Sequence, residues 1–555
     1  MVMTWQFVSA ARKRLSREQG TIFKDWGGKL PIALVYPNSY HVGMSNLGFQ
    51  TVYALFNQDE RVVCERAFWD ERARDILDRS PFSLESQREL REFAVIAFSV
   101  TFELDYFNAV SALRSAGLPL LAAERDERHP LVIGGGPAIT GNPEPIAPFL
   151  DAVAIGEAEV IAPRLVEVLK AGTEWERPDF LRRLAEVPGI YVPSLYEVAY
   201  GTDGAVEAIT PVEDALLATF PVARQLVRNL REHPVHSAVL TPDTELGDMY
   251  LIEISRGCAR GCKFCLAGSI FRPVRKQAMD VIETEALEGL KYRQRLGLVA
   301  AATTDYPRIG ELAARLRRMG ARIAVSSLRM DSITDELLQA LAESDSHTVT
   351  FAPEAGSERL RSIISKGLSN EQILRAVEMA AQWGFKGLKL YYLIGLPTET
   401  DEDVQAIVDL TLEIKSVIGR HQRKSHITVN LSPFVPKAQT PFQHEPMAEV
   451  GVIERRIRTV QDALRQHGVT VRHESAAWSE IQGVLARGDR RLSEVLGKVS
   501  KTSLHEWKNV MGKCGLDPDF YLRRQRRKGE INPWSGVEGA QSDKVRSRAV
   551  DLLPV

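Results

Sequence analysis

Short apolar runs alternate with amphipathic stretches along the first 200 residues of the chain. Four of these runs, each bounded by polar or turn residues, predict buried strands at 32–36, 93–98, 131–133 and 152–155. Between them, residues 107–116 and 160–170 have helical periodicity. Because strands that alternate with helices build parallel sheets, residues 1–200 predict a doubly wound α/β domain, with any ligand at the carboxyl ends of its strands.

A second and more regular series begins at residue 250. It predicts helices such as 281–296, 309–319 and 371–383, which separate six strands at 251–254, 298–302, 323–325, 348–352, 387–393 and 427–431. This repetition favours a partial (β/α)6 barrel over 248–480, a partial TIM barrel with catalytic groups at the carboxyl ends of its strands. A connector with a hairpin turn at 201–204 is predicted over 201–247, and a helical, then basic extension over 481–555.

The composition is that of an ordinary globular protein, with 44% hydrophobic and 26% charged residues in a chain of 555. The 70 basic and 72 acidic residues give a net charge of −2, so any nucleic acid or membrane surface must be met by a local patch. No apolar stretch is long enough for a membrane span, and residues 1–14 lack the apolar centre of a secretory signal. We therefore expect a cytoplasmic protein.

Three of the five cysteines, Cys258, Cys262 and Cys265, form a C-x3-C-x2-C loop directly after the first predicted barrel strand. Three thiolates on one short loop can hold a single soft metal centre. An iron–sulfur cluster held by three thiolates has one iron open to a substrate or cofactor. A zinc site completed by a distant histidine such as His236 is the alternative that the spacing leaves open.

With Phe264 before its last cysteine, this loop resembles the signature of the radical S-adenosylmethionine (SAM) superfamily. The resemblance implies a 4Fe-4S cluster on the three cysteines, whose open iron binds the amino and carboxylate groups of SAM. It also implies an enzyme that cleaves SAM reductively to a 5′-deoxyadenosyl radical, which abstracts hydrogen from a substrate that the sequence does not specify. An electron donor such as flavodoxin or ferredoxin is implied as a partner.

The resemblance covers residues 250–478 and implies that SAM is contacted after successive barrel strands. After the second strand the family commonly has Gly-Gly-Glu, whereas this chain has Ala-Ala-Thr-Thr-Asp, so Thr303, Thr304 or Asp305 is expected to hold the amino group. The departure from the family pattern leaves open which of the three does so.

Four further residues are implied as SAM ligands by their places in the barrel: Ser327, Arg329, Glu354 and Lys389. A hydroxyl and a cation after the third strand suit a carboxylate, although the serine could equally cap the turn. Glu354 resembles the family's ribose-contacting residue. Lys389 would face the cofactor carboxylate from within the fifth strand, or else lie on the opposite strand face.

The α/β domain resembles the cobalamin-binding class of radical SAM enzymes in its segments 98–101, 134–136 and 151–159. The motif that supplies a histidine ligand to cobalt elsewhere is absent, since the corresponding loop contains His41 without its aspartate. Many members of the class lack that histidine, so cobalamin binding stays open. With cobalamin, methylation or rearrangement at an unactivated carbon is implied. The whole chain most resembles an uncharacterised group of such proteins, several of them linked to a small companion protein.

Two features bear on other classes of protein. Only Cys64 and Cys514 remain for a second cluster, which argues against a methylthiotransferase. The segment 523–528 has five cations in six residues, next to aromatic residues, and is either an RNA-binding segment or a solvated helix end. The alternative hypothesis is accordingly a non-catalytic iron–sulfur or RNA-binding protein with a degenerate SAM site.

Overall fold

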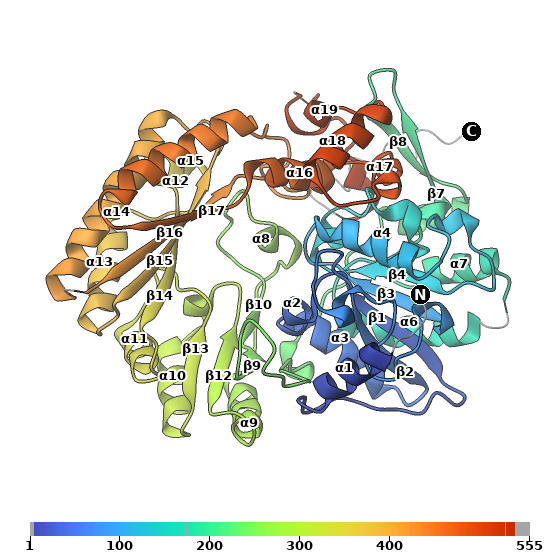
Figure 1. The fold of residues 1–555 in the computed structure, drawn as a ribbon, viewed down its shortest axis with the longest axis horizontal. Coiled ribbons are helices and arrows are strands. Elements are labelled where there is room, and N and C mark those ends of the chain that lie inside the picture. The colour runs from blue at the N-terminus through green and yellow to red at the C-terminus, as the bar shows by residue number, and fades with distance from the viewer. Residues whose placement is uncertain (1–4, 173–174, 423, 525, 528, 539–555) are drawn as a thin grey trace. The chain divides into compact units, whose positions relative to one another are not determined.

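The computed structural model of the chain describes residues 5–172, 175–422, 424–524, 526–527 and 529–538 (Figure 1). The chain divides into two compact units. Unit 1 contains residues 1–227, 237–247 and 484–555, and unit 2 contains residues 228–236 and 248–483. The C-terminal part of the chain therefore belongs to the same unit as the N-terminal α/β domain.

Unit 1 is built on a six-stranded sheet in the order β2-β1-β3-β4-β5-β6, in which only β6 is antiparallel to its neighbour. The strands are β1 Leu30–Tyr36, β2 Val62–Phe68, β3 Val95–Ser99, β4 Leu131–Gly135, β5 Ala152–Ala154 and β6 Ile190–Tyr191. The four strands predicted from apolar runs are all present, which confirms a doubly wound α/β domain. In this order the topological switch point lies between β1 and β3.

The pattern missed β2 because Glu65 and Arg66 interrupt its apolar residues. Both side chains are nevertheless buried. The Arg66 guanidinium forms ion pairs of 2.6 Å with Glu18 and 2.7 Å with Glu85, and all three side chains are at most 2% exposed. A buried cation needs such partners, and they come from sequence positions that no local pattern connects to this strand.

The helices of unit 1 include both helices predicted between the strands, α4 and α6. Before the hairpin they are α1 Trp5–Leu15, α2 Tyr40–Met44, α3 Leu47–Gln58, α4 Asp105–Ser115, α5 Pro137–Gly141, α6 Ala158–Ala171 and α7 Arg177–Ala185. The predicted turn at 201–204 joins the antiparallel strands β7 Tyr196–Tyr200 and β8 Val206–Pro211.

The described part of the C-terminal extension is helical, as predicted, and from residue 484 it belongs to the same unit as the α/β domain. Its helices are α16 Ala476–Arg487, α17 Leu492–Lys498, α18 Leu504–Lys513 and α19 Pro518–Leu522. Arg114 of α4 donates hydrogen bonds to the carbonyl oxygens of Gly497 and Val499. Trp507 lies 5.4 Å from Phe107 of α4, centroid to centroid, in an edge-on arrangement. Helix α4 of the α/β domain and the C-terminal helices thus pack against each other.

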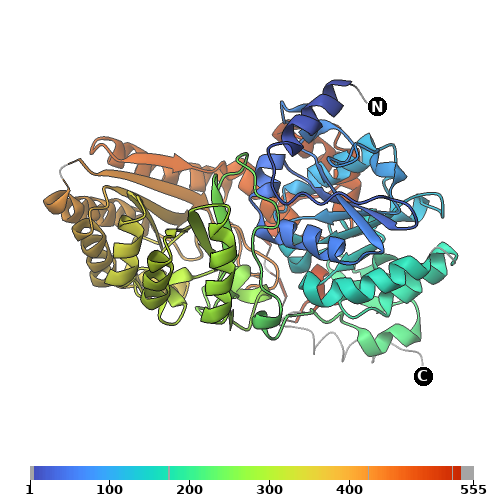
Figure 2. The same ribbon diagram turned by 90° about the horizontal axis from the view of Figure 1, so that it is seen from below.

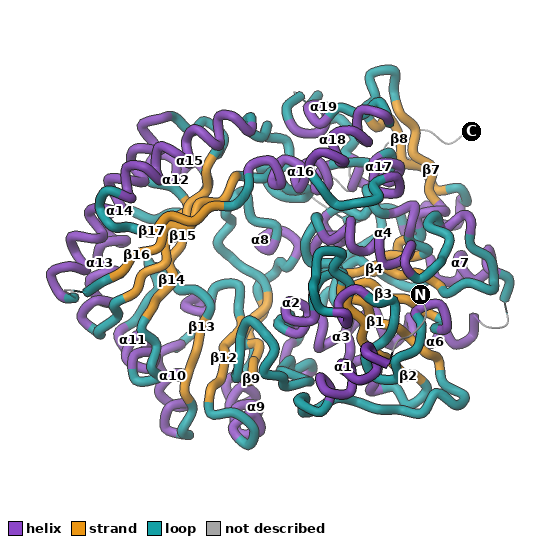
Figure 3. The backbone as a smooth tube through the Cα atoms, in the orientation of Figure 1, coloured by secondary structure: helices purple, strands orange, loops and turns teal. Residues whose placement is uncertain are grey.

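Unit 2 is a partial barrel of parallel strands covered by helices (Figures 1 and 3). Its strands form two sheets, β13-β12-β9 and β14-β15-β16-β17, joined by an isolated parallel bridge between Leu328 and Phe351. The strands are β9 Met249–Glu253, β12 Arg295–Val299, β13 Arg322–Val325, β14 Thr348–Glu354, β15 Gly387–Ile394, β16 His426–Pro433 and β17 Thr470–His473. All six predicted strands are present. The unpredicted β17 is mostly exposed and has no apolar run.

The helices of unit 2 follow its strands as the periodicity predicts. They are α9 Met279–Leu290, α10 Ile309–Arg318, α11 Asp335–Ala342, α12 Glu358–Ile363, α13 Asn370–Gln382, α14 Asp401–His421 and α15 Val450–Arg465. The views in Figures 1 and 2 place these helices on one face of the strands. In β15, Leu388, Leu390 and Tyr392 are buried while Lys389 and Tyr391 are exposed, so the face away from the helices is polar.

No helix among the described residues is long and apolar enough to cross a membrane.

Candidate functional site

The cysteine loop of unit 2 is closed at its base by a two-residue antiparallel pairing. The strands β10 Ser255–Arg256 and β11 Arg275–Lys276 pair across it, so that residues 257–274 form a loop. Gly257 begins this loop at φ +86°, and a Cβ there would lie 2.2 Å from the carbonyl oxygen of Phe271. Only glycine permits this close approach, which holds the residue before Cys258 against the far end of the loop.

The middle of the loop is fixed to the barrel. The backbone N–H of Lys263 donates to the carbonyl of Ile364 at 3.0 Å, and the carbonyl of Lys263 accepts from the N–H of Phe442 at 3.0 Å. Phe264 packs against a buried cluster that includes Ile364 and Phe442. The structure therefore gives Phe264 an anchoring role between the last two cysteines.

The three cysteines of the loop are free thiols and only partly exposed. Burial raises the pKa of Cys262, while the nearby cations Lys366 and Arg329 act to lower it. Burial also raises the pKa of Cys265, and the N–H of Gly268, 3.4 Å from its Sγ, acts in the opposite direction. Gly268 belongs to the short helix α8, Ala267–Ile270. A metal binds the thiolate form, which these cations and this donor favour.

An ion-pair network joins the cysteine loop to the carboxyl ends of β12 and β13. Arg260, between the first two cysteines, donates to both carboxylate oxygens of Asp305, at 2.7 and 2.5 Å, and to Asp331 at 2.8 Å. Arg329 donates to Asp331 at 3.0 and 3.1 Å. Burial alone would raise the pKa of Asp305, but hydrogen bonds from Arg260 and Ser332 lower it overall. No local sequence pattern connects Arg260 with either aspartate.

The three residues predicted to replace the Gly-Gly-Glu motif form a single 3-10 turn, Thr303–Asp305. The hydroxyl of Thr304 accepts from the backbone N–H of Arg329 and from Ser332. Thr303 is 1% exposed, and its hydroxyl has no hydrogen-bond partner among the described residues. Thr304 and Asp305 thus belong to the network, whereas Thr303 is enclosed beside it.

Glu354 ends β14 in a left-handed conformation, at φ +69°, after a break in the strand register. Its carboxylate lies 3.1 Å from the Nζ of Lys366, and the two side chains are only 16% and 9% exposed. Both groups act electrostatically on the thiol of Cys262. Lys366 was missed in the sequence because it lies in a turn after α12, outside every strand end.

The remaining two predicted ligands are exposed. Ser327 lies in the loop after β13. Lys389 lies on the polar face of β15, between Thr350 of β14 and Thr428 of β16 in the strand register. The structure therefore places Lys389 on the side of the sheet away from the helices, together with the hydroxyl side chains of the adjacent strands.

The histidine of the zinc alternative is engaged elsewhere. The Nδ1 of His236 lies 2.7 Å from the Glu285 carboxylate, and its ring stacks on Tyr250 at 5.6 Å. In the part of the chain that the structure describes, no three Cys, His, Asp or Glu side chains are close enough to share one metal ion. The thiolates of a cuboidal cluster do not share an ion, because each binds a different iron.

In unit 1, the glycines at the carboxyl edge of the sheet are explained by internal packing. Gly136 has φ +106°, and a Cβ there would lie 2.4 Å from the carbonyl oxygen of Val100. A Cβ on Gly156 would lie 2.2 Å from the carbonyl oxygen of Gln225. His41, in the short helix α2 after β1, is exposed. The loops that contain Gly136 and Gly156 therefore pack closely against backbone atoms of other segments of unit 1.

A buried carboxylate lies at the switch point of this edge. Asp105, 5% exposed, begins α4 and accepts a hydrogen bond of 2.9 Å from the side-chain amide of Asn38 after β1. Burial raises the pKa of Asp105 to about 7, against the opposing effect of Asn38. Nearby, the hydroxyls of Tyr36 and Thr101 are 2.8 Å apart.

The basic tail folds back on unit 1. Arg523 pairs with Asp519, Arg524 pairs with Glu530, and Arg527 pairs with Asp203. Lys528 lies outside the described residues. Arg523, Arg524 and Arg527 of the predicted basic segment are therefore paired with carboxylates of unit 1.

Comparison with known proteins identifies the family to which this chain belongs. The family "Radical SAM proteins, N-terminal" matches residues 48–193, and the "Radical SAM superfamily" matches residues 252–411, which include the cysteine loop. An uncharacterised protein of Methanocaldococcus jannaschii is 31% identical over 467 residues, which cover 84% of this chain and 90% of that protein. The chain belongs to the radical SAM superfamily. It is therefore an enzyme of this superfamily, with a reaction that the matches do not specify.

Other relatives of this radical SAM protein are more distant. An uncharacterised methyltransferase of Pyrococcus horikoshii is 27% identical over 310 residues, which cover 54% of this chain and 61% of the relative. The solved structure of TsrM from Kitasatospora setae, a radical SAM methyltransferase with cobalamin and a [4Fe-4S] cluster bound, has a TM-score of 0.49 and 14% identity. It covers 88% of this chain and 99% of its own.

Proposed function

We propose that this chain binds a 4Fe-4S cluster on Cys258, Cys262 and Cys265 and cleaves SAM reductively. The observation that carries the proposal is the position of three free, partly buried thiols on one closed loop at the carboxyl edge of a parallel half-barrel. In such barrels, reacting groups lie at this edge.

The cations and the backbone N–H group around the cysteine loop suit a bound 4Fe-4S cluster. Three thiolates and the sulfides of a cluster bring a high density of negative charge into a partly buried place, which is unfavourable unless cations lie nearby. Lys366 and Arg329 act on Cys262, and Arg260 lies within the loop itself. The backbone N–H of Gly268 already points to the sulfur of Cys265, as a hydrogen bond to a cluster ligand would require.

A cluster bound here would supply one electron to the sulfonium of SAM, so that a carbon–sulfur bond breaks and a 5′-deoxyadenosyl radical is released. The residues of this chain would bind and orient SAM. We assign the amino group to the carboxylate of Asp305, the carboxylate group to Arg329 and Lys389, and the ribose hydroxyls to Glu354. Thr303 and Thr304 support the turn that positions Asp305. Ser327 is exposed in the loop after β13, at the same carboxyl edge of the half-barrel.

In the structure, Asp305, Arg329 and Glu354 of this assignment already pair with neighbouring charged side chains. Arg260 and Arg329 hold Asp305 and Asp331, and Lys366 holds Glu354. Such pairing keeps side chains in a fixed geometry before SAM arrives, so less conformational entropy is lost on binding. The polar face of the half-barrel, with Tyr391 opposite Asn430 in the strand register, would lie beside the bound cofactor.

The decisive experiment is anaerobic incubation of the purified protein with SAM and dithionite, followed by chromatographic detection of 5′-deoxyadenosine. We expect 5′-deoxyadenosine to form only when reductant, SAM and the reconstituted cluster are all present. Absence of the product while the cluster stays intact, measured by its absorbance and iron content, would instead support the alternative of a non-catalytic iron–sulfur protein with a degenerate SAM site.

The finer proposal is that the reaction is a cobalamin-dependent methylation or rearrangement at an unactivated carbon. The doubly wound sheet supports it, because ligands of such sheets bind at the switch point. At this edge Phe102 is 41% exposed and Thr101 is partly exposed, which offers an apolar and a polar contact to a large ligand. The glycines do not add support, because backbone atoms already occupy the space beside them.

Cobalamin binding is tested separately from SAM cleavage. After reconstitution with hydroxocobalamin and desalting, we expect about one equivalent of cobalamin to stay with the protein, measured by its absorption spectrum. Complete loss of cobalamin on desalting would overturn this finer proposal and leave SAM cleavage in place.

A further inference from the structure

The turn after α12 holds Lys366 in a defined backbone geometry. Ser365 and Gly367, on either side of it, both have left-handed conformations, at φ +57° and +64°. This conformation is uncommon for a residue other than glycine, so Ser365 adopts it at a local cost. The buried side chain of Arg361 ties the turn to α12, because its Nε donates to the carbonyl of Leu368 at 2.8 Å. The backbone N–H of Lys366 donates to the carbonyl of Arg361, also at 2.8 Å.

This turn lies against the cysteine loop. The carbonyl of Ile364 accepts from the backbone N–H of Lys263, the residue after Cys262, at 3.0 Å. Burial raises the pKa of the Cys262 thiol, and Lys366 is the cation that opposes this rise most strongly. The backbone contact and the electrostatic effect agree that the ammonium of Lys366 lies near the second cysteine of the loop.

The ammonium of Lys366 has donors to spare. Its Nζ donates to the carboxylate of Glu354 at 3.1 Å and to no other acceptor among the described residues, although its side chain is only 9% exposed. An ammonium has three N–H donors. The Nζ of Lys24 in unit 1 uses three, because it donates to backbone carbonyls at 2.6, 2.8 and 2.9 Å. Lys366 thus has two further donors in a place from which water is largely excluded.

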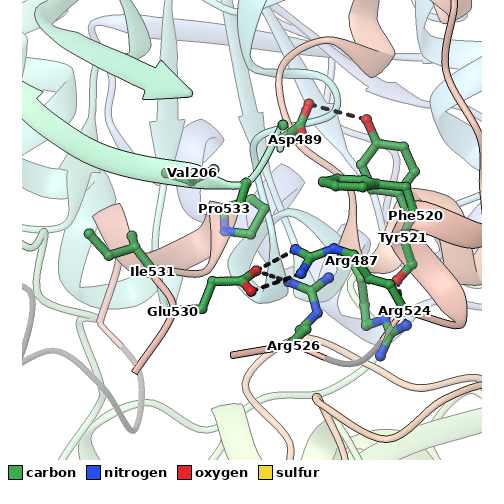
Figure 4. Close-up of a pocket in the computed structure, with 12 residues that line it drawn as sticks. Val206, Arg487, Asp489, Phe520, Tyr521, Arg524, Arg526, Glu530, Ile531 and Pro533 are labelled. Atoms are coloured by element: carbon green, nitrogen blue, oxygen red, sulfur yellow. Dashed lines mark hydrogen bonds and ion pairs between the residues drawn. The ribbon is translucent and has the colours of Figure 1, made fainter. Parts of the chain in front are cut away.

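Buried arginines of unit 1 also have fuller partners than Lys366. In a pocket that contains Arg487 and residues after α19, the carboxylate of Glu530 lies among guanidinium groups (Figure 4). Both oxygens of this carboxylate accept from Arg524. In β2, the guanidinium of Arg66 forms ion pairs of 2.6 and 2.7 Å. The fold itself accounts for the charges of Arg66 and Arg524, whereas the single hydrogen bond of Lys366 leaves part of its ammonium for a ligand.

We propose that Lys366 raises the reduction potential of the cluster on the cysteine loop. The inference rests on the proposed function, because it requires that cluster. On reduction the cluster takes up one electron from an external reductant such as dithionite, and no bond is formed or broken. The added negative charge is stabilised by a nearby cation. Cluster potentials follow net charge, hydrogen bonds to the sulfurs and solvent exposure, and a poorly exposed ammonium with free N–H donors affects each of them.

Two neighbouring charges define the expected size of the effect. Glu354 acts on Cys262 with the opposite sign to Lys366, so it offsets part of the effect of the ammonium. Arg329 is the other cation that acts on this thiol, but it donates to Asp331 at 3.0 and 3.1 Å. Asp331 therefore offsets the charge of Arg329. Removing Lys366 should lower the potential, and removing the charge of Glu354 should raise it.

The test is a redox titration of the full-length protein, reconstituted anaerobically without SAM, at constant pH and ionic strength. Dithionite and mediators set the potential, and the absorbance near 400 nm and the electron paramagnetic resonance signal report the reduced fraction. At the wild-type midpoint, Lys366→Met should lower the ratio of reduced to oxidised cluster about tenfold, which is about 59 mV for one electron. Lys366→Arg keeps the charge and should change the ratio less than threefold.

Lys291→Met is the matched control. Lys291 also pairs with a glutamate, Glu288, but its side chain is 65% exposed at the end of α9, where water screens the charge. This variant should change the ratio less than twofold. Glu354→Gln should raise the ratio at least threefold, because it removes a negative charge and keeps the shape of the side chain. That rise stands as a test even if Lys366→Met assembles no cluster.

Each outcome decides the proposal. Equal midpoints for the wild type and Lys366→Met, with the cluster intact in both, overturn it and leave SAM cleavage in place. Equal shifts in Lys366→Met and Lys366→Arg also overturn it, because they show that the packing of the turn matters and its charge does not. A lower ratio in Glu354→Gln contradicts the assigned signs. A wild type that assembles no 4Fe-4S cluster overturns this inference together with the proposed function.

Discussion

Both units of this protein contain parallel strands, and ligands of such sheets bind at the carboxyl ends of the strands. The residues at these carboxyl ends differ between the two units. In unit 2 the edge has three thiols and a network of charged side chains from three strand ends. In unit 1 it has glycines that pack against backbone atoms and one buried carboxylate. The comparison teaches that a parallel α/β sheet indicates where a ligand would bind, while the side chains at its edge decide whether chemistry is available.

The cysteines give the largest expected difference between the units. Cys262→Ala should abolish the cluster and 5′-deoxyadenosine formation, because a cluster with two protein thiolates is held too weakly. Cys64→Ala, which alters a buried thiol of β2 in unit 1, should retain both. Iron and sulfide content and the absorbance near 400 nm measure the result. Full iron content in Cys262→Ala would contradict the proposed site.

The glycine at the base of the cysteine loop gives the next effect. Gly257→Ala should destabilise unit 2 by about 2 kcal/mol or more, because the left-handed conformation is strained for alanine and the Cβ meets the carbonyl of Phe271. Gly320→Ala is the matched control, with φ +90° and nothing within 4 Å of the added Cβ, and should cost about 1 kcal/mol. Urea unfolding measures both. Equal losses would show that the close contact is unimportant.

Arg260 tests whether the network positions SAM. Arg260→Met should raise the KM for SAM about tenfold with a smaller change in kcat, because Asp305 loses the partner that orients it. Arg308→Met, at an exposed arginine of the same unit, is the control. Arg260→Lys should restore part of the affinity. A loss confined to cluster content would indicate instead that Arg260 acts only on the folding of the cysteine loop.

Asp105 in unit 1 gives the smallest effect and a pH dependence. Since burial raises its pKa to about 7 in the folded protein, the native state binds a proton that the unfolded state has released. The contribution of Asp105 to stability is therefore present below about pH 4 and is lost as the pH rises to about 7. Asp105→Asn should remove this slope, by about 1–3 kcal/mol between pH 5 and pH 8.

Urea unfolding at the two pH values measures the slope, with Asp25→Asn at an exposed site as the control. A wild type and an Asp105→Asn variant with the same pH slope would show that Asp105 is ionised in the fold. Bound cobalamin should change the dependence of stability on pH only if it contacts the carboxyl edge of the unit 1 sheet. The same measurement therefore tests whether the ligand lies at the switch point.

The sequence by itself determined the strand–helix alternation of both units and the cysteine loop. Ten strands were predicted from apolar runs because burial of a regular element imposes a local periodicity that residue types reveal. The sequence pattern did not predict β2, because buried Glu65 and Arg66 interrupt its apolar run. It also did not predict β17, because most of that strand is exposed. The loop was recognisable because its three ligands are neighbours in the chain.

The tertiary structure decided which charged groups meet. Arg260 joins Asp305 and Asp331, Lys366 joins Glu354, and Arg487 meets arginines from beyond α19, over separations that no local pattern encodes. It also paired Arg524 and Arg527 of the basic tail with Glu530 and Asp203, which no local pattern indicated. Local periodicity follows from the geometry of one element, whereas these ion pairs depend on how separate elements pack.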